Sequence, residues 1–257
     1  MLNRIRTGKG PVVILSHALG CDLGMWDEVA ALLEGDYTVI RYDHRGHGAS
    51  AAPAGPFTIE ALADDAAALI RAECGTTPAH FVGLSMGGMT AQALAARHPS
   101  VVSSITIANA ANRYDETARA LWRARIETVR AHGLAAISGS ALQRWFTEAF
   151  LQNTAEGGKA RCAALRSTLE SMSPEAYVAA CAAVAGIELD RSSPNIACPT
   201  LVIAGTLDAA TPPSMSEAIV RCIPGARLES IEAAHLSAVE QPDAFADLLR
   251  QFWASLS

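Results

Sequence analysis

One stretch decides the fold of this chain: residues 80–87, with the sequence HFVGLSMG. Its first part, residues 80–84, is an apolar run of strand length, and an Ala-rich segment with helical spacing begins near Met86. A strand that turns this abruptly into a helix holds the residue at the turn, Ser85, in a strained backbone conformation. The flanking glycines remove side chains that would collide there. The pattern predicts a serine hydroxyl that projects from the carboxyl edge of a sheet.

The second feature is a pair of residues that could activate this serine. A serine hydroxyl is a weak nucleophile near neutral pH, so catalysis needs a base that accepts its proton and a carboxylate that orients the base. Asp208 follows the expected strand 200–204, and His235 follows the expected strand 227–231. Parallel strands would bring both positions beside Ser85. We therefore predict a catalytic triad of Ser85, Asp208 and His235.

Each member of this triad also has a purely structural interpretation. The serine motif occurs by chance in glycine-rich turns, Asp208 could simply begin the turn into residues 211–213, and a lone histidine is more often a surface or core residue. Other candidate acids are Asp190 and Asp243, and other candidate bases are His17, His44, His47, His80, His98 and His132. Order along the chain and position after a strand favour Asp208 and His235.

Ester hydrolysis also needs hydrogen-bond donors where negative charge develops on the carbonyl oxygen. Met86, at the start of the expected helix, is predicted to supply one backbone N–H. The second is assigned to Leu19, in the loop after the expected strand 12–15, although neighbouring amides of that loop could serve instead. These two residues would form the oxyanion hole through their backbone, while their side chains shape the pocket.

Strand and helix signals alternate along most of the chain. We expect strands at 12–15, 38–42, 80–84, 101–108, 200–204 and 227–231, and helices at 26–33, 59–73, 86–97 and 242–256. This alternation predicts an α/β fold with a mostly parallel central sheet and helices on both faces. Residues 112–187 have helical spacing broken by glycines at 133, 139, 157, 158 and 186. We therefore expect a core domain of residues 1–111 and 188–257 and a helical cap insert of residues 112–187.

Composition excludes several classes of protein. The chain has 257 residues, 50% of them hydrophobic and 18% charged, which suits one large globular core and not a disordered chain, collagen or a coiled coil. A net charge of -6 argues against a nucleic-acid partner. Six cysteines without a Cys-x-x-Cys pair are interpreted as reduced thiols. With no expected secretory signal or membrane span, we expect a cytoplasmic protein without a membrane partner.

These residues, together with residues 45–50 (RGHGAS), resemble the α/β-hydrolase superfamily across essentially the whole chain. A narrower resemblance, to 3-oxoadipate enol-lactonases, is carried by residues 19–27, 83–88, 144–147, 181–183, 233–237 and 240–242. It implies an α/β-hydrolase fold and hydrolysis of 3-oxoadipate enol-lactone through an acyl-enzyme on Ser85, in the β-ketoadipate route of aromatic catabolism, without a metal or an organic cofactor.

Two departures from the family pattern stand out. Only residues 1–11 precede the first expected buried strand, where the family usually has a complete strand hairpin, so we expect a shortened N-terminal hairpin at the sheet edge. Cys21 stands in the oxyanion loop where a threonine is usual. This change should be tolerated, because the backbone amides of the loop, and not its side chains, bind the oxyanion.

The substrate implied by the resemblance carries a free carboxylate, which a basic side chain in a cleft between sheet and insert would orient. Arg125 and Arg144 are the candidates, and Trp122 and Trp145 lie close to them in sequence and would wall the pocket. An arginine on an insert helix is usually solvated, however, and a tryptophan there usually packs the insert onto the core. The same triad would also serve a broad-specificity carboxylesterase, a cofactor-free perhydrolase or a ligand-sensing module. The sequence leaves the oligomeric state open.

Overall fold

A computed structural model describes residues 2–52, 55–154 and 157–256 of the chain. Its centre is a seven-stranded sheet with the order β1-β3-β2-β4-β5-β6-β7. The strands are β1 (Arg4–Gly8), β2 (Val12–Ser16), β3 (Thr38–Tyr42), β4 (Ala79–Leu84), β5 (Val102–Ala108), β6 (Thr200–Gly205) and β7 (Arg227–Ile231). Neighbouring strands are parallel except for β1, which pairs antiparallel with β3.

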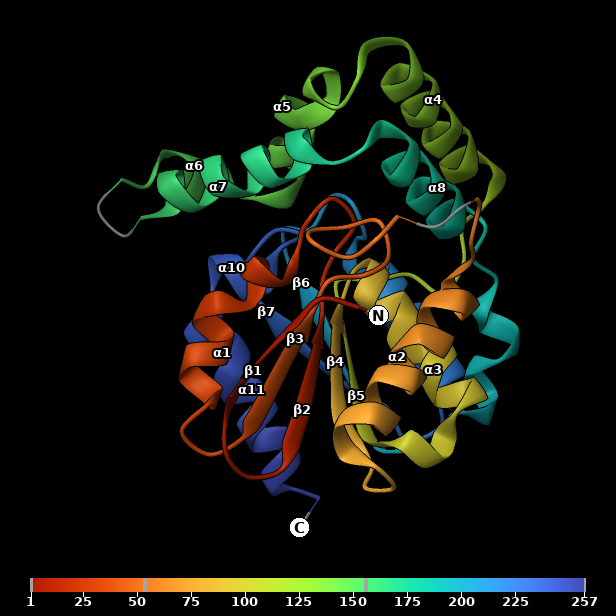
Figure 1. Cartoon of the computed structure of the whole chain (residues 1–257), viewed down its shortest axis with the longest axis vertical. Coiled ribbons are helices and arrows are strands. Elements are labelled where there is room, and N and C mark those ends of the chain that lie inside the picture. The colour runs from red at the N-terminus through yellow and green to blue at the C-terminus, as the bar shows by residue number, and fades with distance from the viewer. Residues whose placement is uncertain (1, 53–54, 155–156, 257) are drawn as a thin grey trace.

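Helices cover both faces of the sheet, as Figure 1 shows. On one face α1 (Asp27–Leu33) packs against α11 (Pro242–Ala254), and on the other α2 (Ile59–Cys74) packs against α3 (Met86–Arg97). The inner strands β3 and β6 are buried along their whole length, which explains why neither alternates between apolar and polar residues. No helix of the described residues is long and apolar enough to cross a bilayer.

Helices between β5 and β6 form a separate layer over the core, which we call the cap layer (green, top of Figure 1). They are α4 (Glu116–His132), α5 (Ala135–Trp145), α6 (Glu148–Gln152), α7 (Gly158–Ser171) and α8 (Pro174–Ala185). The two ends of this layer meet in a neck. The Leu189 N–H donates to the Asn112 carbonyl at 2.7 Å, and Arg113 and Glu188 form an antiparallel backbone bridge.

The structure confirms the predicted α/β architecture and adds elements that the patterns did not indicate. Strand β1 was missed because its sequence, RIRTG, is charged and lies half-exposed at the sheet edge. It is the one strand in residues 2–11, and it pairs with β3 and not with the strand that follows it, β2. Helices α9 (Pro213–Cys222) and α10 (Ser237–Glu240) were also missed.

The predicted break at Gly139 was wrong, because this glycine lies inside α5 on an open face of the helix. We retain residues 112–187 as the proposed extent of the insert. Residues 1, 53, 54, 155, 156 and 257 of the proposed domains lie outside the described part of the chain.

Candidate active site

Strand β4 turns into α3 at Ser85 without an intervening loop. The φ angle of Ser85 is 57°, in the left-handed region that residues other than glycine rarely adopt. Two glycines allow the helix to approach the sheet closely. A Cβ atom on Gly83 would lie 2.0 Å from the carbonyl oxygen of Gly87, and one on Gly87 would lie 2.1 Å from that of Ser16. Larger residues would push the helix away, so the glycines place Ser85 at the carboxyl end of β4.

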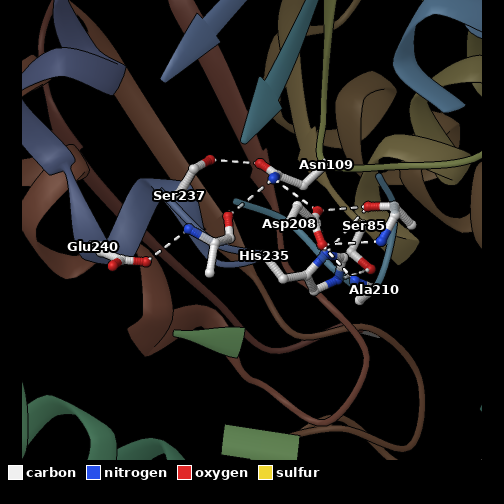
Figure 2. A network of polar contacts seen from close by, with 9 residues as sticks. Ser85, Asn109, Asp208, Ala210, His235, Ser237 and Glu240 are labelled. Carbon is white, nitrogen blue, oxygen red and sulfur yellow. Dashed lines mark hydrogen bonds and ion pairs between the residues drawn. The ribbon is translucent and has the colours of Figure 1, made fainter. Parts of the chain in front are cut away.

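Asp208 and His235 reach Ser85 from the loops after β6 and β7. The Nε2 atom of His235 lies 2.9 Å from Oγ of Ser85, and its Nδ1 lies 2.8 Å from Oδ2 of Asp208 (Figure 2). Because the carboxylate accepts a hydrogen bond from Nδ1–H, Nε2 is left as the acceptor for the serine proton. Asp208 and His235 are buried, whereas Ser85 is partly accessible. The structure therefore brings the three predicted residues into the hydrogen-bonded order that a general base requires.

The Asp208 carboxylate has further donors. Its Oδ1 accepts the N–H groups of Ala210 and Thr211 at 2.8 and 2.9 Å, and its Oδ2 accepts Thr211 Oγ1 at 2.8 Å and Asn109 Nδ2 at 3.0 Å. Burial alone would raise the pKa of this carboxyl group. The charge and hydrogen bond of His235, with the bonds from Thr211 and Asn109, outweigh that effect and hold the pKa below its usual value. Asp208 therefore stays ionised beside the imidazole. The same residue also begins the turn into residues 211–213.

Asn109 is a residue of this network that the sequence analysis missed. It follows β5 directly, is buried and has a φ angle of 47°. Besides Asp208, its Nδ2 bonds the Ala234 carbonyl at 3.2 Å, and its Oδ1 accepts the Ser237 hydroxyl at 2.5 Å (Figure 2). One side chain thus connects Asp208 to both flanks of His235. Its position at the carboxyl end of a strand, shared with Asp208, is the signal that could have identified it.

The two predicted oxyanion amides have no competing acceptor. The N–H groups of Leu19 and Met86 donate no hydrogen bond within the described part of the chain. Met86 is the first residue of α3, where a backbone N–H has no partner inside the helix and suits a negative charge. Ser16 of β2 lies opposite Gly83 of β4, so the loop with Leu19 and the turn at Ser85 leave the sheet from adjacent strands. This arrangement supports the proposed oxyanion hole.

Three histidines brace the loop that carries Leu19. His17, His44 and His47 are buried, and the His17 ring centroid lies 4.7 and 5.0 Å from those of the other two. His17 Nε2 accepts the His44 N–H at 2.9 Å, and His47 Nε2 accepts the Gly20 N–H at 3.4 Å. Burial lowers the pKa of all three, that of His47 to about 3. They are therefore neutral supports of the loop at physiological pH.

Three of the remaining candidate acids and bases have partners of their own, and the other two lie on helices outside the network around Ser85. Asp190 pairs with Arg113, His80 bonds Ser104, His98 pairs with Asp64, Asp243 lies in the first turn of α11, and His132 is exposed at the end of α4.

Trp145 is the substrate-pocket candidate that the structure places against the active-site loops. Its buried ring packs on Gly20, where a Cβ atom would lie 3.4 Å from two ring carbons. Its carbonyl oxygen accepts the N–H of Leu236 at 3.0 Å. Trp145 therefore touches the loop of Leu19 and the residue that follows His235.

The two candidate arginines have different environments. Arg125 Nε donates to Tyr177 Oη at 2.7 Å, and the guanidinium lies 5.9 Å from the Trp122 ring centroid and 5.7 Å from that of Tyr177. Its terminal nitrogens form no hydrogen bond with the described residues, so they remain available for a ligand. Arg144 is exposed on α5 and has no ion pair within the described ranges.

Aromatic side chains surround the Arg125 region. The ring of Tyr114 lies 6.1 Å from that of Trp122, centroid to centroid. Burial, and after it the negative charge of Asp208, raises the pKa of the Tyr114 hydroxyl. Tyr114 therefore contacts Trp122, whose ring in turn lies below the Arg125 guanidinium.

Comparisons with known proteins show what the whole chain is similar to. A family model described as alpha/beta hydrolase fold matches residues 11–242. The chain is 39% identical to 3-oxoadipate enol-lactonase 2 of Acinetobacter baylyi, over 91% of this chain and 85% of that protein. It is 34% identical to 3-oxoadipate enol-lactonase 1 of the same organism, over 96% and 90%. Among solved structures, it is similar to the enol-lactonase from Burkholderia xenovorans LB400, with a TM-score of 0.92, 35% identity and coverage of 98% of this chain and 96% of that one.

Proposed function

Because this chain belongs to the α/β-hydrolase family and is a carboxylic ester hydrolase, we propose that it opens 3-oxoadipate enol-lactone to 3-oxoadipate. The observation that carries the proposal is the hydrogen-bonded set of Ser85, His235 and Asp208, in a chain that matches two enol-lactonases over most of its length. The reaction would belong to aromatic catabolism by the β-ketoadipate route. The six cysteines are free, which supports a place in the reducing cytoplasm.

The first half of the proposed reaction acylates the enzyme. Ser85 Oγ attacks the lactone carbonyl carbon while His235 Nε2 takes the serine proton, and the carboxylate of Asp208 stabilises the imidazolium. The backbone N–H groups of Leu19 and Met86 bind the oxyanion. The ring C–O bond then breaks and expels an enol oxygen, a better leaving group than an alkoxide, and the enol can tautomerise to the ketone.

The second half releases the product. His235, neutral again after it has protonated the leaving oxygen, removes a proton from water, and the resulting hydroxide attacks the acyl carbon. The same two amides bind the second oxyanion. The C–O bond to Ser85 breaks, the serine recovers its proton from the imidazolium, and the acid leaves.

Turnover of the lactone tests the proposal directly. The purified enzyme should consume enol-lactone generated in situ, with a higher kcat/KM than for a neutral aryl ester of similar size, because only the lactone combines the enol leaving group with a carboxylate. The measurement is the loss of lactone absorbance over time. Rapid hydrolysis of aryl esters without consumption of the lactone would contradict the proposal and indicate a broad-specificity carboxylesterase.

A second prediction concerns the substrate carboxylate, which we assign to Arg125. Arg125→Ala should raise KM for the lactone about 10- to 100-fold, because a charge-assisted hydrogen bond is lost, and should leave KM for a neutral ester within about twofold. Steady-state kinetics on both substrates measure this difference. Arg144→Ala is the matched control, because that side chain is exposed and should affect neither substrate. Equal effects of Arg125→Ala on both substrates would contradict a carboxylate site there.

A further inference from the structure

Glu240 is a buried carboxylate that the reaction above does not use. It lies at the end of α10, with 9% of its surface exposed. Its Oε2 accepts the N–H of Ala234 at 3.0 Å (Figure 2). Its Oε1 accepts the N–H of Thr147 at 3.3 Å and the Thr147 hydroxyl. The carboxylate therefore joins the residue before His235 to the cap layer.

The cap layer has a second connection to the same loop. The Trp145 carbonyl accepts the N–H of Leu236, the residue after His235, at 3.0 Å. Segment 145–147 is thus linked directly to Leu236 and, through Glu240, to Ala234, while the Trp145 ring packs on Gly20 of the oxyanion loop. One short segment of the cap layer therefore contacts both the loop that carries His235 and the loop of the oxyanion hole.

The three groups around Glu240 are all hydrogen-bond donors, and a carboxylate can accept hydrogen bonds on both of its oxygens. A buried charge is costly unless hydrogen bonds satisfy it, and here three donors converge on two oxygens. A glutamine would turn its NH2 group toward either Ala234 N–H or Thr147, so one donor would face another donor. An alanine would leave the buried Ala234 N–H without an acceptor. The carboxylate is therefore required to hold both sides together.

We propose that Glu240 is a positioning residue for His235: it fastens the His235 loop to segment 145–147 and so keeps Nε2 aligned with Ser85 Oγ. The inference rests on the proposed serine-hydrolase function. Residues 144–147 and residues 240–242 both carried the family resemblance, and neither run belongs to the triad or the oxyanion hole. The inference gives these two runs one shared role.

The test measures the reactivity of Ser85 with a fluorophosphonate and, separately, kcat and KM for 4-nitrophenyl acetate. In the first reaction Oγ bonds to phosphorus, fluoride leaves and the serine proton goes to His235, so the rate reports the alignment of the base. Glu240→Ala should lower the labelling rate and kcat on the order of 10- to 100-fold and change KM less than about twofold. Labelling at the wild-type rate in a folded Glu240→Ala protein overturns the inference. A wild-type protein that is not labelled overturns the proposed function itself, and Glu240 then has no base to position.

Variants of Thr147 provide a second test of the inference if Glu240→Ala does not fold. Thr147→Val, which lacks the hydroxyl, should slow labelling in the same sense, and Thr147→Ser, which retains it, should keep the wild-type rate. Because the hydrogen bond between the Thr147 hydroxyl and Glu240 is lost in both variants, Glu240→Ala with Thr147→Val should be no slower than Glu240→Ala alone. Additive losses overturn the inference, since the two residues would then act separately. Glu148→Ala, an exposed neighbour on α6, is the matched control and should label normally.

A spectroscopic measurement separates positioning from a general loss of stability. The proton that His235 Nδ1 shares with Asp208 should give a downfield resonance in the wild-type NMR spectrum. In Glu240→Ala this resonance should shift or broaden at a temperature where circular dichroism shows a folded protein. An unchanged resonance together with slow labelling overturns the inference, because the imidazole would then be held correctly without Glu240.

Discussion

Replacement of Ser85 with alanine is expected to lower kcat for the lactone and for aryl esters by about 10⁴- to 10⁶-fold, with little change in KM. The substitution removes the Oγ atom that attacks the carbonyl carbon and leaves His235 with no hydroxyl to deprotonate. The backbone strain at this position is unchanged, because alanine has the same Cβ atom as serine. The free energy of unfolding should therefore stay within about 1 kcal/mol of the wild-type value.

Steady-state kinetics of the Ser85→Ala protein measure the loss in kcat, and urea unfolding measures its free energy of unfolding. Ser140→Ala, at an exposed position on α5, is the matched control and should retain full activity. Turnover by Ser85→Ala at even a tenth of the wild-type rate would show that another nucleophile carries the reaction. A wild-type protein that binds the lactone without consuming it would point instead to a sensing role.

Asp208→Asn is expected to lower kcat by about 10⁴-fold through the tautomer of His235. Two backbone N–H groups, those of Ala210 and Thr211, point at Oδ1 of Asp208, so the amide oxygen of an asparagine would occupy that position. Its NH2 group would then face Nδ1 of His235, which would have to become an acceptor. The ring proton would move to Nε2, where it blocks proton transfer from Ser85.

Kinetics over a range of pH check the Asp208 prediction, because the loss should appear in kcat while KM stays within about threefold. Asp190→Asn is the control, since Asp190 is paired with Arg113 at the neck and lies outside the network around Ser85. A tenfold or smaller loss in kcat for Asp208→Asn would show that the carboxylate charge and its acceptor geometry are not needed to orient the base.

The parts of the site that could be predicted are those set by position along a strand. Ser85, Asp208 and His235 each follow an apolar run, and parallel strands bring such positions to one edge whatever lies between them. Strand β1 could not be predicted in this way, because one edge pairing with β3 leaves it exposed and requires no apolar pattern.

The contacts of Asn109 and Glu240 could not be predicted because they depend on distance in space, although the end of β5 marks where Asn109 lies. Asn109 bonds to a residue 99 positions away, and Glu240 bonds to one 93 positions away. No local pattern marks either contact. Arg125 and Arg144 are both arginines on helical segments, so the sequence does not distinguish them. The packing of α4 against α8 places Arg125 between aromatic rings, whereas Arg144 on α5 faces solvent.

The neck of the cap layer has a consequence for how specificity can change. Strands β5 and β6 are adjacent, so the chain leaves and re-enters the sheet at neighbouring positions, and the contacts among Asn112, Arg113, Glu188 and Leu189 hold those two points together. The whole cap layer is therefore one long crossover connection between β5 and β6. The entropy of closing such a connection grows only with the logarithm of its length. Helices beyond the neck can therefore be exchanged by recombination without a change in the register of the strands that hold the triad, and a new cap must restore the contacts of residues 145–147 with Glu240 and Leu236.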